Sequence, residues 1–248
     1  MDTSVMITLG FLVFAIVMFA WEKIPLSITA MVVAVGLHLS GVLSAKEAFA
    51  GFVDPNVLLF MGMFVIGEAF FATGVAVGVG NVVHKFAKTE TSLLVAVMMI
   101  TGVLSGFLSN TGTAAVLIPV IIGICKKSGF KQTKLLMPLV FAAAMGGNLS
   151  LIGAPGNLIA QSELQKNGLS FGFFEYAIVG VPILICGILF YATIGHRLLP
   201  DREPTDDGAF DTTKNFDDVP KWKQIVSLVV LVLTLLGMIF EEQIGIKL

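Results

Sequence analysis

Charged residues are scarce in this sequence. Asp, Glu, Lys and Arg make up 13% of its 248 residues, about half of the roughly 25% that is typical of soluble domains. Hydrophobic residues make up 56%, and the mean hydropathy is +0.93. The net charge of −2 excludes the strongly basic field that attracts nucleic acid. The composition therefore predicts an integral membrane protein that is surrounded by lipid and has no nucleic-acid partner.

Residues suited to covalent or metal chemistry are also few. The two cysteines, Cys125 and Cys186, lie far apart in apolar segments, which argues against a disulfide framework and against a clustered metal site. The sequence has no Gly-x-Ser-x-Gly, no His-Glu-x-x-His and no paired aspartates in its apolar segments, so we do not expect an enzyme. No Lys or Arg precedes the first apolar run, which favours a retained membrane helix over a cleaved signal peptide.

Uninterrupted apolar runs predict membrane-spanning helices, for which roughly 20 apolar residues suffice. They are Val5–Ala20, Ile24–Leu39, Val57–Thr73, Tyr176–Ile194 and Ile225–Phe240. We expect polar connectors at Ser40–Asn56 and Gln161–Glu175, and a helix lying along the membrane interface at Gly74–Glu90. The Asp-rich stretch His196–Lys223 is expected to be a solvated linker.

A sixth apolar run, Ser92–Cys125, has a polar centre. Ser105, Ser109, Asn110, Thr111 and Thr113 interrupt it beside a glycine, and such residues loosen a helix by bonding their own backbone. We therefore expect a re-entrant hairpin that turns at Ser109–Thr113 and leaves the membrane on the side from which it entered. Irregular backbone at that depth is tolerated only where protein buries it or where it lines a wet cavity, so this is a candidate binding site.

A seventh apolar run, Leu135–Ala160, is also interrupted. Its centre, Gly146–Asn157, holds four glycines and a proline, which cannot continue a helix. We expect two half-helices around an unwound loop. The predicted fold class is thus all-α, and we divide the chain into scaffold-like helices at 1–90, the hairpin and broken helix at 91–160, and further membrane helices at 161–248, with a cytoplasmic linker at 195–223.

Lysines on both sides of Ser92–Cys125 favour the hairpin. Lys85 and Lys88 precede this run and four lysines follow it, so a full crossing would put Lys-bearing segments on opposite sides of the membrane. Because Lys and Arg gather on the cytoplasmic side, a run that enters and leaves on one side fits better. In this orientation the N-terminus lies outside and the linker inside, with Lys23 as a weak exception.

The two interruptions suggest a chemistry. Freed carbonyls and hydroxyls suit an alkali cation, whereas the N-termini of half-helices suit a carboxylate or another oxyanion. Neither interruption contains Asp or Glu, and a multivalent metal would want charged ligands. Na⁺ is therefore favoured over Ca²⁺ or Mg²⁺. The alternative for any single Ser, Thr or Gly here is close packing of membrane helices, where small residues are common.

At these residues the chain resembles the divalent anion/sodium symporter family, solute carrier family thirteen and its bacterial relatives, within the ion transporter superfamily. The matching motifs are Ser109-Asn110-Thr111 and the Gly-Gly-x-x-x-Leu-Ile-Gly-x-Pro-x-Asn loop at Gly146–Asn157. Weaker matches occur at Trp21–Pro25, Gly41–Glu47 and Asn56–Gly62. The loop departs from the family in Ala154-Pro155-Gly156, where a hydroxyl residue and two prolines are usual, and at Asn148, where Thr or a smaller residue is usual.

The resemblance implies sodium-coupled secondary transport of small anions, such as di- or tricarboxylates or sulfate, by a homodimer with elevator-type alternating access in a bacterial inner or plasma membrane. It implies a Na⁺ site built from Ser105, Ser109, Asn110 and the backbone around Gly146, Gly147 and Asn148. It implies substrate contacts from Ser109, Asn110, Thr111 and Asn157.

The family repeats the hairpin and the broken helix in inverted orientation, and no second Ser-Asn-Thr occurs before Leu248. We therefore expect this chain to be the N-terminal half of a longer carrier, or a half that needs a partner chain. Two alternatives stay open. One is an efflux pump or Na⁺/H⁺ antiporter of the same superfamily, for which Glu68 is the sole carboxylate on offer; the other is a non-transporting membrane subunit or anchor.

Overall fold

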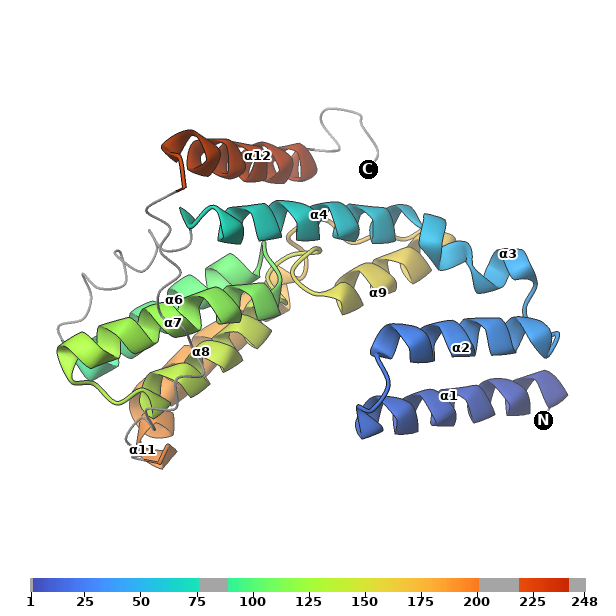
Figure 1. The fold of residues 1–248 in the computed structure, drawn as a ribbon, viewed down its shortest axis with the longest axis horizontal. Coiled ribbons are helices and arrows are strands. Elements are labelled where there is room, and N and C mark those ends of the chain that lie inside the picture. The colour runs from blue at the N-terminus through green and yellow to red at the C-terminus, as the bar shows by residue number, and fades with distance from the viewer. Residues whose placement is uncertain (1, 76–88, 201–218, 241–248) are drawn as a thin grey trace. The chain divides into compact units, whose positions relative to one another are not determined.

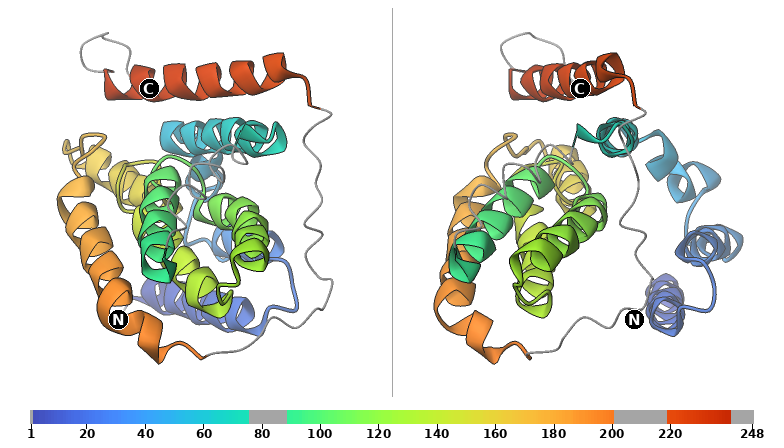
Figure 2. Two further views of the ribbon diagram at one scale, coloured as in Figure 1. Left: turned by 90° about the vertical axis from the view of Figure 1, so that its left-hand side faces the viewer. Right: turned by 60° about the vertical axis from the view of Figure 1, so that its left-hand side comes forward.

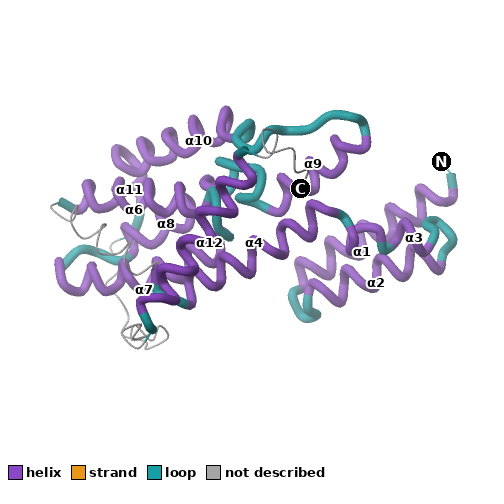
Figure 3. Tube along the Cα trace, turned by 90° about the horizontal axis from the view of Figure 1, so that it is seen from above, coloured by secondary structure: helices purple, strands orange, loops and turns teal. Residues whose placement is uncertain are grey.

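The computed structural model describes residues 2–75, 89–200 and 219–240, and these ranges contain helices and no strand (Figures 1 and 3). They divide into two compact units, Met1–Leu58 and Leu59–Leu248. The helical, strand-free architecture agrees with the all-α fold class predicted from the sequence. The predicted interfacial helix at Gly74–Glu90 and the predicted linker at His196–Lys223 fall largely on 76–88 and 201–218, outside the described residues.

The first unit begins with two helices, α1 (Thr3–Trp21) and α2 (Leu26–Leu39), which pack against each other. Gly36 of α2 lies so close to the Phe11 ring of α1 that a Cβ at Gly36 would overlap ring carbons. Short helices α3 (Ala45–Ala48) and η1 (Ala50–Val53) follow. A capping box starts α3, because Ser44 Oγ accepts from the Glu47 N–H at 3.3 Å while the Glu47 carboxylate accepts from the Ser44 N–H at 2.9 Å.

Within the described residues, four helices are long and apolar enough to cross a membrane: Thr3–Trp21, Pro55–Ala72, Ala177–Leu198 and Lys221–Ile239. This finding confirms the multi-pass membrane protein predicted from composition. The second predicted span is shorter than expected, since α2 has 14 residues and a helix of that length rises only about 21 Å, against a hydrocarbon core of about 30 Å. It starts late because Glu22–Pro25 separates it from α1.

The second unit takes in most of α4 (Pro55–Ala72) and all later helices. These are α6 (Glu90–Ser105), α7 (Asn110–Ser128), α8 (Thr133–Gly146), α9 (Pro155–Lys166), α10 (Ala177–Phe190), the π-helical η2 (Tyr191–Gly195), α11 (His196–Leu198) and α12 (Lys221–Ile239). Helices α6, α7, α8 and α10 gather around one apolar core (Figure 2). Its fully buried side chains include Leu93, Met98, Leu117, Leu135 and Leu139.

Glycine lets the backbones of this unit approach closely at two points. A Cβ at Gly146 of α8 would collide with the backbone of Gly102 in α6, including its carbonyl oxygen. A Cβ at Gly180 of α10 would collide with the carbonyl of Asn148. Close approach of this kind is what small residues permit in membrane helices. The end of α8 is therefore fixed between α6 and α10.

A second apolar cluster packs against the turn that joins α6 to α7. Phe70 and Phe71 of α4 pack there with Leu108, Ile152 and Leu231. The Thr73 and Ser227 hydroxyls lie 2.8 Å apart and join the end of α4 to α12. The turn between α6 and α7 and the loop after α8 are thus held under α4 and α12 by side chains far apart in sequence.

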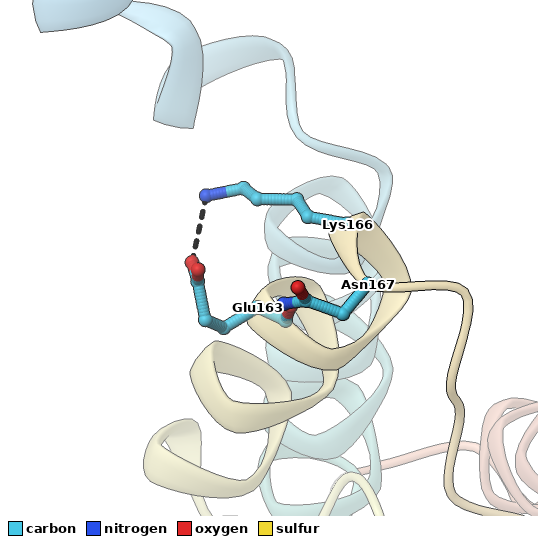
Figure 4. A network of polar contacts seen from close by, with 3 residues as sticks. All are labelled: Glu163, Lys166 and Asn167. Atoms are coloured by element: carbon cyan, nitrogen blue, oxygen red, sulfur yellow. Dashed lines mark hydrogen bonds and ion pairs between the residues drawn. The ribbon is translucent and has the colours of Figure 1, made fainter.

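The outer end of α9 is polar. Lys166 Nζ lies 2.8 Å from the Glu163 carboxylate, and Asn167 Nδ2 donates to the Glu163 carbonyl at 3.0 Å (Figure 4). Both charged side chains are exposed, and an ion pair of this kind contributes only about 0–1 kcal/mol. The pair lies in the last turn of α9, where the side chains are exposed.

Candidate functional site

The hairpin turn lies three residues earlier than predicted. Helix α6 ends at Ser105, Gly106–Ser109 forms the turn, and α7 begins at Asn110. Ser109 is the N-cap of α7, and its Oγ accepts from the Gly112 N–H at 3.0 Å. The predicted turn at Ser109–Thr113 is therefore wrong in position, because the cluster of polar residues starts a helix by capping it.

Ser105 and Asn110 meet across this turn. The completely buried Ser105 hydroxyl donates to the carbonyl of Ala143 in α8 at 2.7 Å and lies 2.6 Å from the Asn110 side-chain amide. Turned so that its nitrogen faces the carbonyls, this amide has three acceptors within reach of its two N–H groups: Ala143 O at 3.1 Å, Gly153 O at 3.2 Å and Ser105 Oγ at 2.6 Å. Asn110 thereby bridges the hairpin, the end of α8 and the loop that follows α8.

The loop between α8 and α9 runs from Gly147 to Ala154. Gly147 lies beneath Asn110, where a Cβ would stand 2.8–2.9 Å from both polar atoms of the side-chain amide. The buried Ser150 hydroxyl donates to Gly106 O in the hairpin turn. Asn157, in the first turn of α9, donates from Nδ2 to Gly147 O and to Ser150 O, each at 2.9 Å. The loop is unwound, yet the carbonyls of Gly147, Ser150 and Gly153 accept hydrogen bonds from asparagine side chains.

The connector after α9 supports the same loop from outside. The Tyr176 hydroxyl donates to Asn157 O at 3.1 Å, and the Leu151 N–H donates to Phe173 O at 2.9 Å. The Gln161 side chain pairs with the Phe171 backbone, accepting from its N–H at 2.8 Å and donating to its carbonyl at 3.3 Å. The connector is thus tied back to α9 and to the loop.

The structure brings together part of the predicted Na⁺ set. Ser105, Asn110 and Gly147 are in contact, and the Gly146 carbonyl lies near Gly106 at the same point. Ser109 stands at the helix cap beside them. The Asn148 side chain is exposed and its carbonyl lies against Gly180 of α10, so Asn148 is directed toward a different neighbour.

The predicted substrate residues are spread over two helix starts. Thr111 is exposed in the first turn of α7, with Ser109 and Asn110 before it. Asn157 is buried in the first turn of α9, and both hydrogens of its amide are directed at loop carbonyls. In this geometry Asn157 holds the loop, and Ser109–Thr111 is the part that remains accessible at a helix N-terminus.

The donor set has the chemistry of an alkali-ion site. Among the described residues, no group of three or more His, Cys, Asp or Glu side chains could hold a metal ion. The groups that do converge are neutral: a hydroxyl, backbone carbonyls and the Asn110 amide. Hydroxyl and carbonyl oxygens suit a weakly held monovalent cation. The first N–H groups of α7 lack partners one turn back in the helix and carry the positive end of its dipole, as an anion site requires.

Several residues that support the hairpin and the loop could not have been predicted from the sequence. Ser150, Tyr176 and Gly180 each depend on a neighbour 19 or more positions away or on another element. Ser150 sits inside the interrupted loop, and its polarity in an apolar run was the available signal. Glu68 lies exposed on α4, and no contact described for the hairpin or the loop involves it.

Comparison with known proteins gives the family. The model of the CitMHS citrate transporter family matches residues 16–247. The chain is 35% identical over 222 residues to the uncharacterized transporter YfbS of Escherichia coli, covering 88% of this chain and 36% of that protein. It is 26% identical over 233 residues to the sodium-dependent dicarboxylate transporter SdcS of Staphylococcus saprophyticus, covering 86% and 44%.

A further relative is sodium/sulfate cotransporter 1 of Chlamydomonas reinhardtii, 27% identical over 205 residues that cover 79% of this chain and 23% of that protein. The chain thus spans less than half the length of each of these relatives. Relatives named for sodium, sulfate and dicarboxylate agree with the resemblance drawn from the two motifs. This chain belongs to the citrate transporter family, a family of membrane transporters and not of enzymes.

Proposed function

We propose that this chain supplies one half-site of a sodium-coupled carrier for small anions such as di- or tricarboxylates or sulfate. The observation that carries the proposal is the Asn110 amide, which joins Ser105, Ala143 O and Gly153 O and so unites the hairpin turn with the unwound loop. Both irregular segments meet at one cluster of neutral oxygens inside an otherwise apolar helical unit. Relatives named for sodium-dependent dicarboxylate transport and sodium/sulfate cotransport support the same choice of ions.

The proposed Na⁺ ligands are drawn from Ser105, Ser109, Asn110 and the backbone of Gly146, Gly147 and Asn148. Each hydroxyl or carbonyl oxygen already used in one hydrogen bond keeps a second lone pair for a cation. No carboxylate is needed, since an alkali ion in a membrane protein is commonly held by carbonyl and hydroxyl oxygens. The geometry favours Ser105, Asn110 and Gly147 as the centre of this set, because they are in contact.

The proposed anion site is the exposed start of α7, where Ser109, Asn110 and Thr111 present hydroxyl and backbone N–H groups. An oxyanion there would gain from these donors and from the helix dipole. Asn157 contributes through the loop, since its amide hydrogens are already donated to Gly147 O and Ser150 O. A cation at the neighbouring oxygens would lower the cost of bringing the anion in, which is the physical basis of coupling.

The larger assembly is proposed from the family resemblance. The chain covers 36–44% of the two bacterial relatives, and a second, inverted copy of the hairpin and broken helix would complete the site. Symport would then follow from an elevator-type shift of both copies in a homodimer within a bacterial inner membrane. The predicted division at 1–90, 91–160 and 161–248, with a re-entrant hairpin in the middle region, belongs to the same proposal.

The test is anion uptake by the native full-length protein in proteoliposomes, with and without a Na⁺ gradient. We expect Asn110→Ala to abolish Na⁺-dependent uptake, because it removes the amide that joins the two segments. Asn167→Ala is the matched control, since Asn167 caps the exposed end of α9 and should leave uptake unchanged. Normal uptake by Asn110→Ala would refute the site assignment.

The same assay separates the two alternatives. A proton-coupled antiporter would lose transport in Glu68→Gln and would ignore added anion. A non-transporting subunit would show neither uptake nor Na⁺ binding in the intact protein. The polar contacts between hairpin and loop favour the symporter over an anchor, because an anchor needs no irregular polar segments inside an apolar helical unit.

A further inference from the structure

Ser150 stands at the centre of the unwound loop and is completely buried. Its hydroxyl donates to Gly106 O, and Gly106 is the first residue of the hairpin turn. This contact joins residues 44 positions apart. A buried serine that crosses from one irregular segment to the other fixes their separation, because the hydrogen bond tolerates little change in length.

The backbone oxygen of Ser150 makes a second contact, with α9. It accepts from Asn157 Nδ2 at 2.9 Å, and the same Nδ2 donates to Gly147 O at 2.9 Å. Ser150 is therefore linked to the hairpin through its side chain and to α9 through its backbone. Helix α9 and the hairpin turn are thus joined through this one residue.

Carbonyl crowding explains why a donor is needed at this position. A Cβ placed at Gly153 would lie 2.6 Å from Gly147 O and 3.0 Å from Gly106 O, so both carbonyl oxygens point into one small region. Two buried carbonyl dipoles directed at the same place repel each other unless each accepts a hydrogen bond. Asn157 supplies the bond to Gly147 O, and Ser150 supplies the bond to Gly106 O.

The turn that Ser150 holds carries proposed cation ligands at its end. Gly106 follows Ser105 directly, and Ser109 and Asn110 close the same turn. Asn110 in turn lies on Gly147 and donates to Gly153 O. Any shift of Gly106 relative to the loop changes the spacing between the side-chain oxygens of the hairpin and the carbonyls of the loop.

We propose that Ser150 is a positioning residue for the Na⁺ site, acting through Gly106 to set the distance between the hairpin ligands and the loop carbonyls. This inference rests on the function proposed above. Ser150 itself need not touch the ion. Its hydroxyl is used on the hairpin, and the consequence of losing it is a Na⁺ site with the right ligands at the wrong spacing.

The experiment compares Ser150→Ala and Ser150→Thr in the native full-length protein reconstituted in proteoliposomes. Uptake is measured against Na⁺ concentration, and the KM for the anion is measured at saturating Na⁺. Ser150→Ala leaves Gly106 O without its donor, a loss of about 1–3 kcal/mol that corresponds to a rise of about 5- to 150-fold in the Na⁺ concentration for half-maximal uptake. The anion KM at saturating Na⁺ should stay within about twofold, because Ser150 does not contact the anion.

Ser150→Thr keeps the hydroxyl and should restore the Na⁺ dependence. Ser40→Ala is the matched control, because Ser40 also donates to a backbone carbonyl, that of Leu37 at 3.1 Å, but is exposed and lies in the other unit. If Ser150→Ala does not fold, Ser150→Cys takes its place, since a thiol is a weak donor and should give a smaller rise of the same kind.

A Na⁺ dependence in the folded Ala or Cys variant that equals that of wild type overturns the positioning role alone. So does a fall in maximal uptake with no change in the Na⁺ requirement. Wild-type uptake that ignores Na⁺ overturns the proposed function, and this inference with it. The two failures are therefore distinguishable in one set of titrations.

Discussion

Replacing Gly146 by alanine tests the contact between α6 and α8. A Cβ at Gly146 would overlap Gly102 O and would stand 2.8 Å from Gly102 Cα and 2.9 Å from its carbonyl carbon. These are backbone atoms of a helix, so no side chain can rotate to make room. The two helices must separate, and overpacking of this kind costs about 1–3 kcal/mol.

Gly123→Ala is the internal control for this prediction. Gly123 lies within α7, and a Cβ there would meet no atom within 4 Å. Alanine in the interior of a helix is favoured over glycine by about 0.5–1 kcal/mol. The two substitutions add the same methyl group, and the structure predicts opposite signs for their effects on stability.

The assay is thermal unfolding in mild detergent, followed by reaction of a thiol dye with Cys125. Cys125 is buried and Cys186 is exposed, so a Cys186→Ala background leaves Cys125 as the reporter of unfolding. We expect Gly146→Ala to lower the melting temperature by several degrees, at about 2–4 °C per kcal/mol, and Gly123→Ala to raise it slightly. A Gly146→Ala protein as stable as Gly123→Ala would refute the close approach of α6 and α8.

Two further predictions concern a buried hydroxyl and an exposed carboxylate. The Thr113 hydroxyl is buried and has no hydrogen-bond partner among the described residues, so Thr113→Val should stabilise the protein by about 1 kcal/mol or more; a lower melting temperature would reveal a partner for the hydroxyl. In the connector after α2, the hydrogen bond from the Ser44 side chain holds the pKa of the Glu47 carboxyl below its ordinary value, and Ser44→Ala should raise that pKa in a carboxyl-carbon NMR titration. Because the folded-state pKa of Glu47 is lowered, the stabilisation by this carboxylate is present above the unfolded-state pKa and is lost as pH falls through the folded-state pKa. An unchanged Glu47 pKa in Ser44→Ala would contradict the capping box.

The lengths of the apolar runs, and the residues that interrupt them, made the positions of most helices predictable. The run Ser92–Cys125 was too polar at its centre for one continuous helix, and α6 and α7 indeed lie on either side of a break. The glycines and proline of Gly146–Asn157 coincide with the gap between α8 and α9. Both signals are local, since they depend on what a residue does to its own backbone.

The exact turn and the supporting contacts were not predictable from those signals. Ser109 can either bend a chain or cap a helix, and the bond from Gly112 N–H decides for the cap. Gly180 acquires its role because Asn148 O lies against it, which depends on how α10 packs. Asn157 was expected beside the substrate because of the resemblance, whereas its amide hydrogens are directed at two loop carbonyls. Direct contact of Asn157 with the anion stays a prediction.

The network that holds the Gly147–Ala154 loop has an entropic consequence. Fixing one backbone residue costs about 1–2 kcal/mol, and here Asn110, Ser150 and Asn157 fix the loop through hydrogen bonds within the protein itself. An ion that binds to a preorganised loop does not have to order it, so most of the contact energy appears as affinity. Neutral oxygens interact only weakly with a monovalent cation. Rigidity of the loop is therefore what would allow so weak a set of ligands to hold Na⁺ firmly enough for coupling, yet loosely enough for release.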